Sequence, residues 1–304
     1  MCPFNGPGAP RKTETLDPKL VFKFMREIPR GQKLWFAGTG EFFMDPHALN
    51  HLQLASHLGH EPRVLTNGQQ MAPSLIDAVL ESGVRKIRFS VDAIDPQNYA
   101  HIRRGGSFDD ILMTCMYVRS RKPAYPGLRV EVNNTLFKDT IARQSEFARF
   151  WRGKVDQVNF NAEYYDIFKF RNLFFTPGAR VGCQLSLYLL PSGRLSPCCA
   201  VNVYQHYNSL DWLPHASAVS ASQAWEQFQA MYADSSSELR RICASCEWWV
   251  LWAKDKDGNS PYWREVPFDR GSGFLSRTIR RCISRIQSVH GSLTPVLMSG
   301  LAAR

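Results

Sequence analysis

Five apolar stretches, rich in β-branched and aromatic residues, recur along the first 170 positions of the chain. They cover residues 33–41, 63–68, 86–93, 129–137 and 157–165. The segments between them carry apolar residues at helical spacing, as in 72–83 and 107–120. Strand and helix therefore alternate, which predicts an α/β fold with a parallel sheet and crossover helices. Five units at this spacing fit an open or closed barrel better than a sheet wound on both faces.

Small and polar residues gather where the expected strands end, which is the functional edge of such a barrel. They include Thr39, Gly40, Glu41, Thr66, Asn67, Ser90, Asp92, Asn133, Asn134, Asn161 and Glu163. Some of these positions also have structural explanations, because Asn67-Gly68 is a common turn dipeptide and Asp95-Pro96 can start a helix. A loop of small residues that ends in a carboxylate, as in 39–41, can capture the amino group of a ligand. Two polar residues that alternate along a strand, as in Ser90 and Asp92, can hold the two hydroxyls of a ribose.

A second group of candidates consists of cysteines that lie next to turn residues rather than on an apolar face. Cys183 and Cys198 flank a hairpin-like segment with its turn at 191–193, and Cys243 and Cys246 form a Cys-x2-Cys pair. Four thiolates suit either a structural zinc ion or a [4Fe-4S] cluster, and the ligand type does not separate the two. Cys199 adjoins Cys198 and is an alternative ligand to it.

Composition and charge limit the partners and the cellular compartment that we expect. The chain has 304 residues, 44% of them hydrophobic, and a formal net charge of +10, which could indicate a nucleic acid or an anionic membrane as partner. The basic residues are mostly scattered, however, and we expect no DNA partner. The dense basic patch at 277–285 belongs to an expected amphipathic helix that docks on its own domain or faces solvent. No signal peptide and no apolar run of membrane-spanning length is found, so we expect a cytoplasmic, reduced protein in which Cys115 and Cys282 are simply buried apolar residues.

The quoted segments together resemble a known family. GTGEFFMDP at 38–46, VLTNGQQM at 64–71, IRFSVDAIDPQNYAHIRRGGSFDDIL at 87–112 and the cysteine pattern are similar to the radical S-adenosylmethionine (radical SAM) superfamily, in the branch with a SPASM or shorter twitch domain. The resemblance covers roughly residues 1–250. It implies a partial (β/α)6 TIM-like barrel that binds S-adenosylmethionine (SAM) at a [4Fe-4S] cluster held by a CxxxCxxC loop. The implied reaction is reductive cleavage of SAM and hydrogen abstraction from a small-molecule or peptide substrate, with an external electron donor such as flavodoxin or ferredoxin.

The resemblance also implies roles for the strand-end residues. Thr39, Gly40 and Glu41 match the Gly-Gly-Glu motif that meets the methionine amino group, with Thr39 in place of the first glycine. Ser90 and Asp92 match the strand that contacts the ribose. Thr66 and Asn67 match positions that line the site. No catalytic side chain is implied, since the implied roles are all in cofactor binding.

For the cysteines, the resemblance implies one auxiliary [4Fe-4S] cluster with the ligands Cys183, Cys198, Cys243 and Cys246. Cys2 resembles the last cysteine of CxxxCxxC, but the first two cysteines and the strand before them are not in this sequence. Either the start was assigned too late, at an internal methionine, or the chain is a decayed relative. We therefore expect a barrel without its first strand, a radical cluster only in an N-terminally extended form, and no radical activity from residues 1–304 alone.

The expected organisation is a partial barrel at 1–179, a small cysteine-rich auxiliary-cluster domain at 180–252, and a basic tail with the amphipathic helix at 253–304. A second interpretation remains open. In it the protein is noncatalytic, with the four cysteines around zinc or a single cluster and the barrel used for binding.

Overall fold

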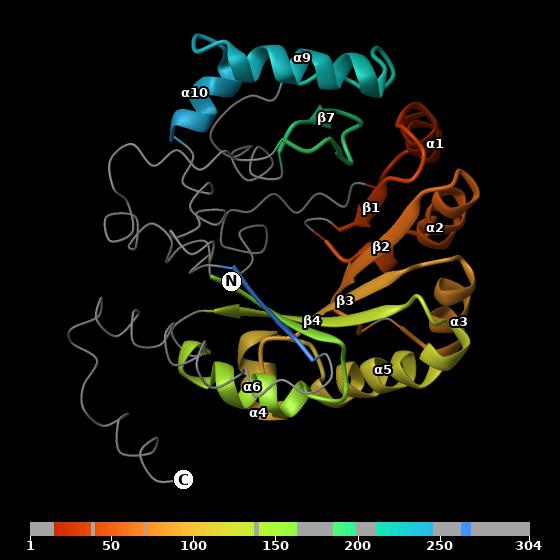
Figure 1. Ribbon diagram of the computed structural model, residues 1–304, viewed down its shortest axis with the longest axis vertical. Coiled ribbons are helices and arrows are strands. Elements are labelled where there is room, and N and C mark those ends of the chain that lie inside the picture. Colours follow the sequence, from red (N-terminus) through yellow and green to blue (C-terminus); the bar gives the residue numbers. More distant parts are fainter. Residues whose placement is uncertain are drawn as a thin grey trace, which may run out of the picture.

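The computed structural model describes residues 15–37, 40–69, 71–136, 140–162, 185–198, 211–245 and 263–268. Five parallel strands form the centre of the fold, in the order in which they occur along the chain, as Figure 1 shows. They are β1 (Lys33–Phe36), β2 (Glu61–Thr66), β3 (Lys86–Ser90), β4 (Arg129–Leu136) and β5 (Gln157–Ala162). The expected α/β fold with a parallel sheet is confirmed.

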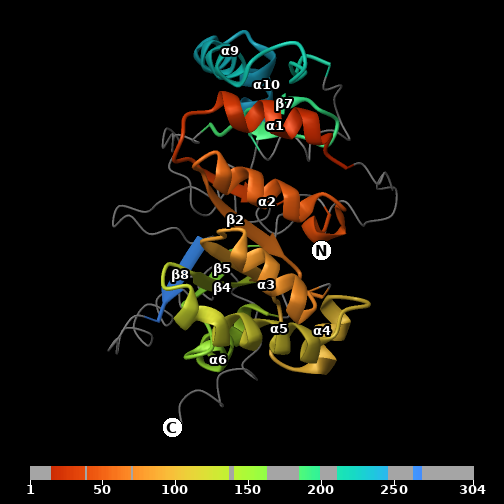
Figure 2. The same cartoon turned by 90° about the vertical axis from the view of Figure 1, so that its right-hand side faces the viewer.

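Helices connect these strands and cover one face of the sheet (Figure 2). They are α2 (Ala48–His57), α3 (Pro73–Glu81), α4 (Pro96–Ile102), α5 (Phe108–Arg121) and α6 (Gln144–Trp151), with short 3-10 turns η1 (Phe42–Met44), η2 (Lys122–Ala124) and η3 (Ile141–Arg143). The start of α4 follows from its sequence, because Asp95 accepts a hydrogen bond from the Asn98 N–H and Pro96 occupies the first turn. Within the described ranges, no helix combines the length and apolar character needed to cross a bilayer.

The main core lies between the sheet and these helices. Its strand side chains include Val64, Ile87, Phe89, Val132, Val158 and Phe160, all of them fully buried. Each such side chain contributes about 1.5–3 kcal/mol by leaving water. Cys115 on α5 is buried in the same core, as the sequence predicts.

The opposite face of the sheet is polar. Register neighbours share a face, so Ser90 on β3, Asn133 on β4 and Asn159 on β5 stand in one row. Closer to the amino ends, Glu131 of β4 is completely buried on this face beside Arg88 and Lys86 of β3. The sheet therefore separates an apolar layer from a polar interior, as a barrel wall does.

A sixth strand, β8 (Trp263–Pro267), pairs antiparallel with β5 and extends the sheet. The sequence pattern does not predict this strand, and its residues fall in the expected basic tail at 253–304. The expected amphipathic helix at 274–286 lies outside the described residues.

A second, smaller group of elements lies beside the β1 end of the sheet (Figure 1). It contains the hairpin β6 (Tyr188–Leu189) and β7 (Leu195–Ser196) and the helices α9 (Ala221–Ala233) and α10 (Glu238–Ser245). The predicted turn at 191–193 is confirmed, with Gly193 in the left-handed region at φ 76°. Helix α1 (Pro18–Glu27) joins the two groups, because Leu20 and Phe24 pack into the small core of the second one.

Candidate cofactor site

The carboxylate of Glu41 is held at the carboxyl edge of the sheet. It follows β1, begins η1, and accepts a hydrogen bond of 2.5 Å from the Thr66 hydroxyl and one of 2.7 Å from the Asn67 N–H. A weaker contact of 3.4 Å comes from the N–H of Phe43. Three residues that the sequence analysis placed in one site are thus in direct contact, although they are 25 and 26 positions apart.

The turn after β2 explains why Asn67 presents its N–H to Glu41. Gly68 adopts φ 73° and donates its N–H back to the Thr66 hydroxyl over 3.0 Å. A Cβ at Gly68 would lie 2.2 Å from Cδ1 of Ile111, so glycine is required by space as well as by conformation. Both the turn interpretation and the site interpretation of Asn67-Gly68 therefore apply.

Asp92, just beyond β3, is buried and tied to two other elements. One carboxylate oxygen accepts a hydrogen bond of 2.8 Å from Nε of Arg103 and forms an ion pair with a terminal nitrogen of the same guanidinium at 2.6 Å. The other accepts the N–H of Thr135 on β4 over 2.6 Å. The sequence did not point to Arg103, because nothing in it shows that the residue after α4 returns to Asp92.

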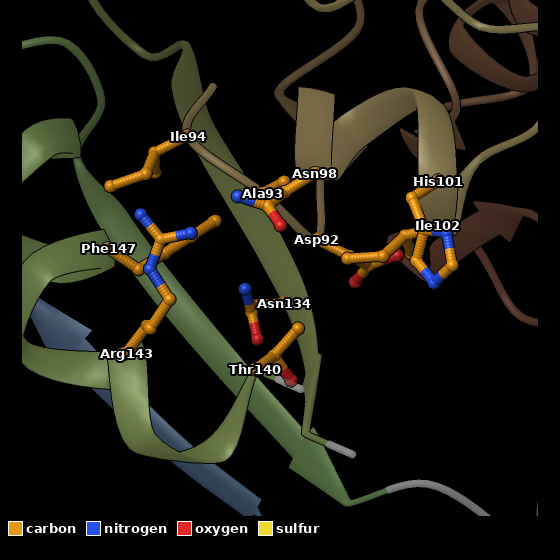
Figure 3. A pocket seen from close by; sticks show the side chains of 10 residues that line it. All are labelled: Asp92, Ala93, Ile94, Asn98, His101, Ile102, Asn134, Thr140, Arg143 and Phe147. Carbon is orange, nitrogen blue, oxygen red and sulfur yellow. The ribbon is translucent and has the colours of Figure 1, made fainter. Parts of the chain in front are cut away.

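A cavity of about 380 Å³ opens beside Asp92, between the ends of β3 and β4 and the helices α4 and α6 (Figure 3). Its polar lining includes Asn98, His101, Asn134, Thr140 and Arg143. Figure 3 shows the Asn134 side chain extending into the space between Arg143 and Asp92. Its Oδ1 atom is buried and has no hydrogen-bond partner among the described residues. A buried acceptor without a partner is costly, so this atom is suited to a ligand that donates a hydrogen bond.

The charges in this cavity are largely compensated. Arg143 bonds to Glu146 at 2.9 Å and to Asp95 at 3.1 Å, and these hydrogen bonds raise its pKa against the effect of burial. Burial alone would raise the pKa of Asp95, but hydrogen bonds from Asn98 and Arg143 lower it below its ordinary value. The cavity thus offers polar groups rather than strong net charge, which suits a neutral nucleoside-like group.

Comparison with known proteins identifies the domain to which the carboxyl edge of the sheet belongs. Residues 1–150 match the family model described as the radical SAM superfamily. These residues form a radical SAM domain. Structures of Streptococcus suis SuiB, bound to the precursor peptide SuiA and to S-adenosylmethionine, share the fold with TM-scores of 0.56 at 14% identity. They cover 74% and 79% of this chain, which spans 61% and 65% of the respective SuiB chains.

A third structure, native anSMEcpe with bound AdoMet, matches with a TM-score of 0.54 at 10% identity and covers 96% of this chain and 92% of its own. No curated protein matches the sequence significantly. At these identities the likeness of the solved structures concerns the fold. It extends past the radical SAM domain into the second group of elements.

The predicted site residues of the radical SAM domain fall into two sets. Gly40, Glu41, Thr66, Asn67, Ser90 and Asp92 all lie at the carboxyl edge of β1, β2 and β3. Thr39 and Cys2 lie outside the described residues. The SAM-binding roles of the first set stay a prediction. The structure adds to it Asn134, which the sequence marked only as a polar strand-end residue, and Arg103, which the sequence did not single out.

The cysteines are only partly placed. Cys198 follows β7, where its backbone carbonyl accepts a hydrogen bond of 2.9 Å from the Ser196 hydroxyl, and Cys243 lies in α10. Cys183, Cys199 and Cys246 lie outside the described residues. Across the ranges that the structure describes, no three metal-binding side chains come together. The auxiliary centre therefore stays a prediction.

Proposed function

We propose that this chain is a radical SAM protein that binds S-adenosylmethionine at the carboxyl edge of β1–β4. The observation that supports this best is the fixed carboxylate of Glu41, with its hydrogen bonds from Thr66 and Asn67. With a [4Fe-4S] cluster, bound SAM supplies reductive cleavage of its sulfonium and hydrogen abstraction from a substrate. The residues of this chain bind and orient SAM.

Glu41 would hold the amino group of the ligand. A carboxylate offers about four acceptor positions. The oxygen that bonds to Asn67 accepts one hydrogen bond and keeps a position for an ammonium group. Because Thr66 and Asn67 already fix the carboxylate, little side-chain entropy is lost on binding, and the charge-assisted hydrogen bond is correspondingly effective.

Asp92 and Asn134 would hold the nucleoside part. The Asp92 oxygen that accepts the Thr135 N–H keeps one acceptor position, and the Asn134 oxygen lines the adjoining cavity without a partner in the described part of the chain. Both can accept hydrogen bonds from ribose hydroxyls. Ser90 is the last residue of β3 and precedes Asp92 by two positions.

The remaining elements of the proposal concern the rest of the chain. We infer a barrel unit at 1–179, an auxiliary [4Fe-4S] unit at 180–252 with the ligands Cys183, Cys198, Cys243 and Cys246, and a basic tail at 253–304. A small-molecule or peptide substrate is inferred, in a cytoplasmic protein that takes electrons from an external donor. The precursor peptide in the SuiB structure supports a peptide as one substrate class.

Isothermal titration of the anaerobically purified chain with SAM tests the proposal. Glu41→Gln should weaken binding about tenfold or more, because a hydrogen bond to a charged group contributes about 1.5–3 kcal/mol. Glu81→Gln is the matched control, since Glu81 is an exposed carboxylate at the end of α3, and it should leave the affinity unchanged. Equal affinities for SAM in both variants would remove Glu41 from the site. Asp92 is a poorer first choice, because its substitution also breaks a buried ion pair.

A further inference from the structure

A second cavity, of about 510 Å³, lies at the opposite end of the sheet from Glu41 and Asp92. It is lined by residues at or just before the amino ends of β2, β3 and β4. The first and last residues of β3 are about 13 Å apart, at about 3.3 Å per residue. This cavity is therefore separate from the proposed SAM site.

Four basic side chains line the cavity: Arg63, Arg85, Lys86 and Arg129. Two of them are compensated, because Arg63 pairs with Glu61 at 2.5 Å and Lys86 with Glu131 at 2.5 Å. Arg129 is exposed and comes only within 4.0 Å of Glu131, which already serves Lys86 and Arg88. Positive charge thus exceeds negative charge at this end of the sheet.

Among the four basic side chains of the cavity, Arg85 is the one whose charge is least compensated by a carboxylate. It is exposed, and its guanidinium has no hydrogen bond or carboxylate partner among the described residues. Its position next to Arg129 is fixed by the backbone, since the Arg129 N–H donates to the Arg85 carbonyl over 2.9 Å. Arg85 immediately precedes β3 and Arg129 begins β4, so the two arginines start from neighbouring backbone segments, which lie about 4.8 Å apart.

Several positions in the loops around these arginines are glycines. Gly31, Gly59 and Gly83 line the cavity and adopt φ values of 82°, 82° and 89°. At Gly127, an added Cβ would lie 3.3 Å from a terminal nitrogen of Arg85. The missing side chains keep the cavity open and leave room for the Arg85 guanidinium against the backbone.

We propose that this cavity binds a diphosphate group, free or as part of a nucleotide. Adjacent like charges repel one another, and a bound polyanion removes this repulsion. Guanidinium forks bind phosphate oxygens in pairs, and two forks that line one cavity match two linked phosphates better than a single one. The cavity volume lies within the range of small-molecule sites, about 300–1,000 Å³.

Isothermal titration of the full chain with inorganic pyrophosphate at low ionic strength tests the site. Arg85→Ala and Arg129→Ala should each weaken binding about tenfold, as expected for losing hydrogen bonds between charged groups. Arg149→Ala is the matched control, because it removes the same charge from an exposed position on α6 and should change the affinity less than about twofold. An equal loss in all three variants would show that only the net charge matters and would overturn the proposal.

A fourth variant separates geometry from charge. Gly127→Ala keeps every charge but places a methyl group 3.3 Å from a terminal nitrogen of Arg85, which must shift slightly; it should weaken pyrophosphate binding, though less than Arg85→Ala does, with an unchanged melting temperature. Titration with ADP distinguishes the sources: tighter binding of ADP than of pyrophosphate indicates a nucleotide, and equal binding indicates the diphosphate alone. No binding of either at millimolar concentration, or binding of a polyglutamate peptide instead, would overturn the proposal.

Discussion

Glu131 places a carboxylate in the interior of the protein, where its charge must be compensated by partners. Its side chain has no exposed area, and it accepts hydrogen bonds from Lys86 at 2.5 Å and from Arg88 at 2.7 and 2.9 Å. Arg88 in turn lies 4.8 Å from the ring centroid of Trp35. Burial alone would raise the pKa of Glu131, but the hydrogen bonds and charges of Lys86 and Arg88 outweigh it and lower this pKa. The ion pair therefore stabilises the folded state while Glu131 is ionised.

Replacing Glu131 with glutamine should lower the free energy of unfolding by about 3–5 kcal/mol at neutral pH, because the fully buried carboxylate charge that pairs with the partly buried Lys86 and Arg88 is removed. The pKa of Glu131 is lower in the folded than in the unfolded state, so its contribution is present above the ordinary value of 4.5 and is lost as the pH falls through the folded-state value. The difference between wild type and Glu131→Gln should therefore shrink in acid. Urea unfolding at about pH 7 and about pH 3.5 measures it.

Glu81→Gln provides the control for this comparison. Glu81 is exposed at the end of α3, and its substitution should change stability by less than about 0.5 kcal/mol at either pH. A difference between wild type and Glu131→Gln that stays constant from neutral to acid pH would contradict the assigned ionisation.

At the residue scale, the sequence predicted which side chains lie at the carboxyl edge of the sheet but not the partner of Asp92, and their cofactor-binding roles stay a prediction. Thr66 ends β2, Asn67 follows it, and Glu41 lies in the loop after β1, so all three fall at the edge where the ends of parallel strands meet. The pairing of Asp92 with Arg103 depends on the length and direction of α4. Such a contact is set by tertiary packing, and no local pattern encodes it.

At the element scale, the five parallel strands were predictable because their apolar, β-branched runs are bounded by turn residues. Strand β8 was not. It is separated from β5 by about a hundred residues, and its pairing with β5 is antiparallel, so the alternation that predicts the parallel sheet says nothing of it. The hairpin of β6 and β7 was signalled by its Pro-Ser-Gly turn.

The hairpin gives the element-scale prediction. Gly193 has φ 76°, and an added Cβ would lie 2.4 Å from Nε2 of His215 and 2.8 Å from Cδ1 of Leu20 on α1. Gly193→Ala should therefore destabilise the second group of elements by more than the cost of a left-handed alanine, about 1–2 kcal/mol. Gly153→Ala is the matched control, since Gly153 has φ 78° and nothing within 4 Å of an added Cβ. Thermal unfolding measures the melting temperature of both variants. An equal decrease in both would show that the contact with His215 and Leu20 does not contribute to the destabilisation.

At the scale of the whole molecule, α1 attaches the second group of elements to the barrel. Lys23 donates to the carbonyl of Val219 over 2.8 Å, and Glu27 accepts the N–H of Ala221, at the start of α9, over 2.8 Å. A carboxylate at a helix N-terminus is favourable for the helix dipole as well. Because Val21 and Met25 of α1 pack in the main core, α1 attaches the start of α9 to the sheet that carries Glu41.

The fold also gathers charges that the sequence leaves apart. Arg63, Arg85, Lys86 and Arg129 extend over 66 positions and count as scattered in the sequence, yet they line one cavity. Parallel strands bring together residues one β/α unit apart, so a site of this kind has no sequence motif. The dense patch at 277–285, which the sequence does show, lies outside the described residues.

The last prediction concerns the auxiliary centre, which requires the whole chain because its proposed ligands extend from Cys183 to Cys246. The anaerobically purified and reconstituted protein should contain about four iron and four sulfide per chain, as in a cluster with four thiolate ligands. Cys243→Ala should lose this iron, since it removes a ligand. Cys115→Ala should keep it, because Cys115 is buried in the main core on α5 and burial raises the pKa of its thiol well above the ordinary value, which disfavours the thiolate that metals need. One zinc ion per chain without iron or sulfide would instead support the noncatalytic interpretation, in which the four cysteines serve structure alone.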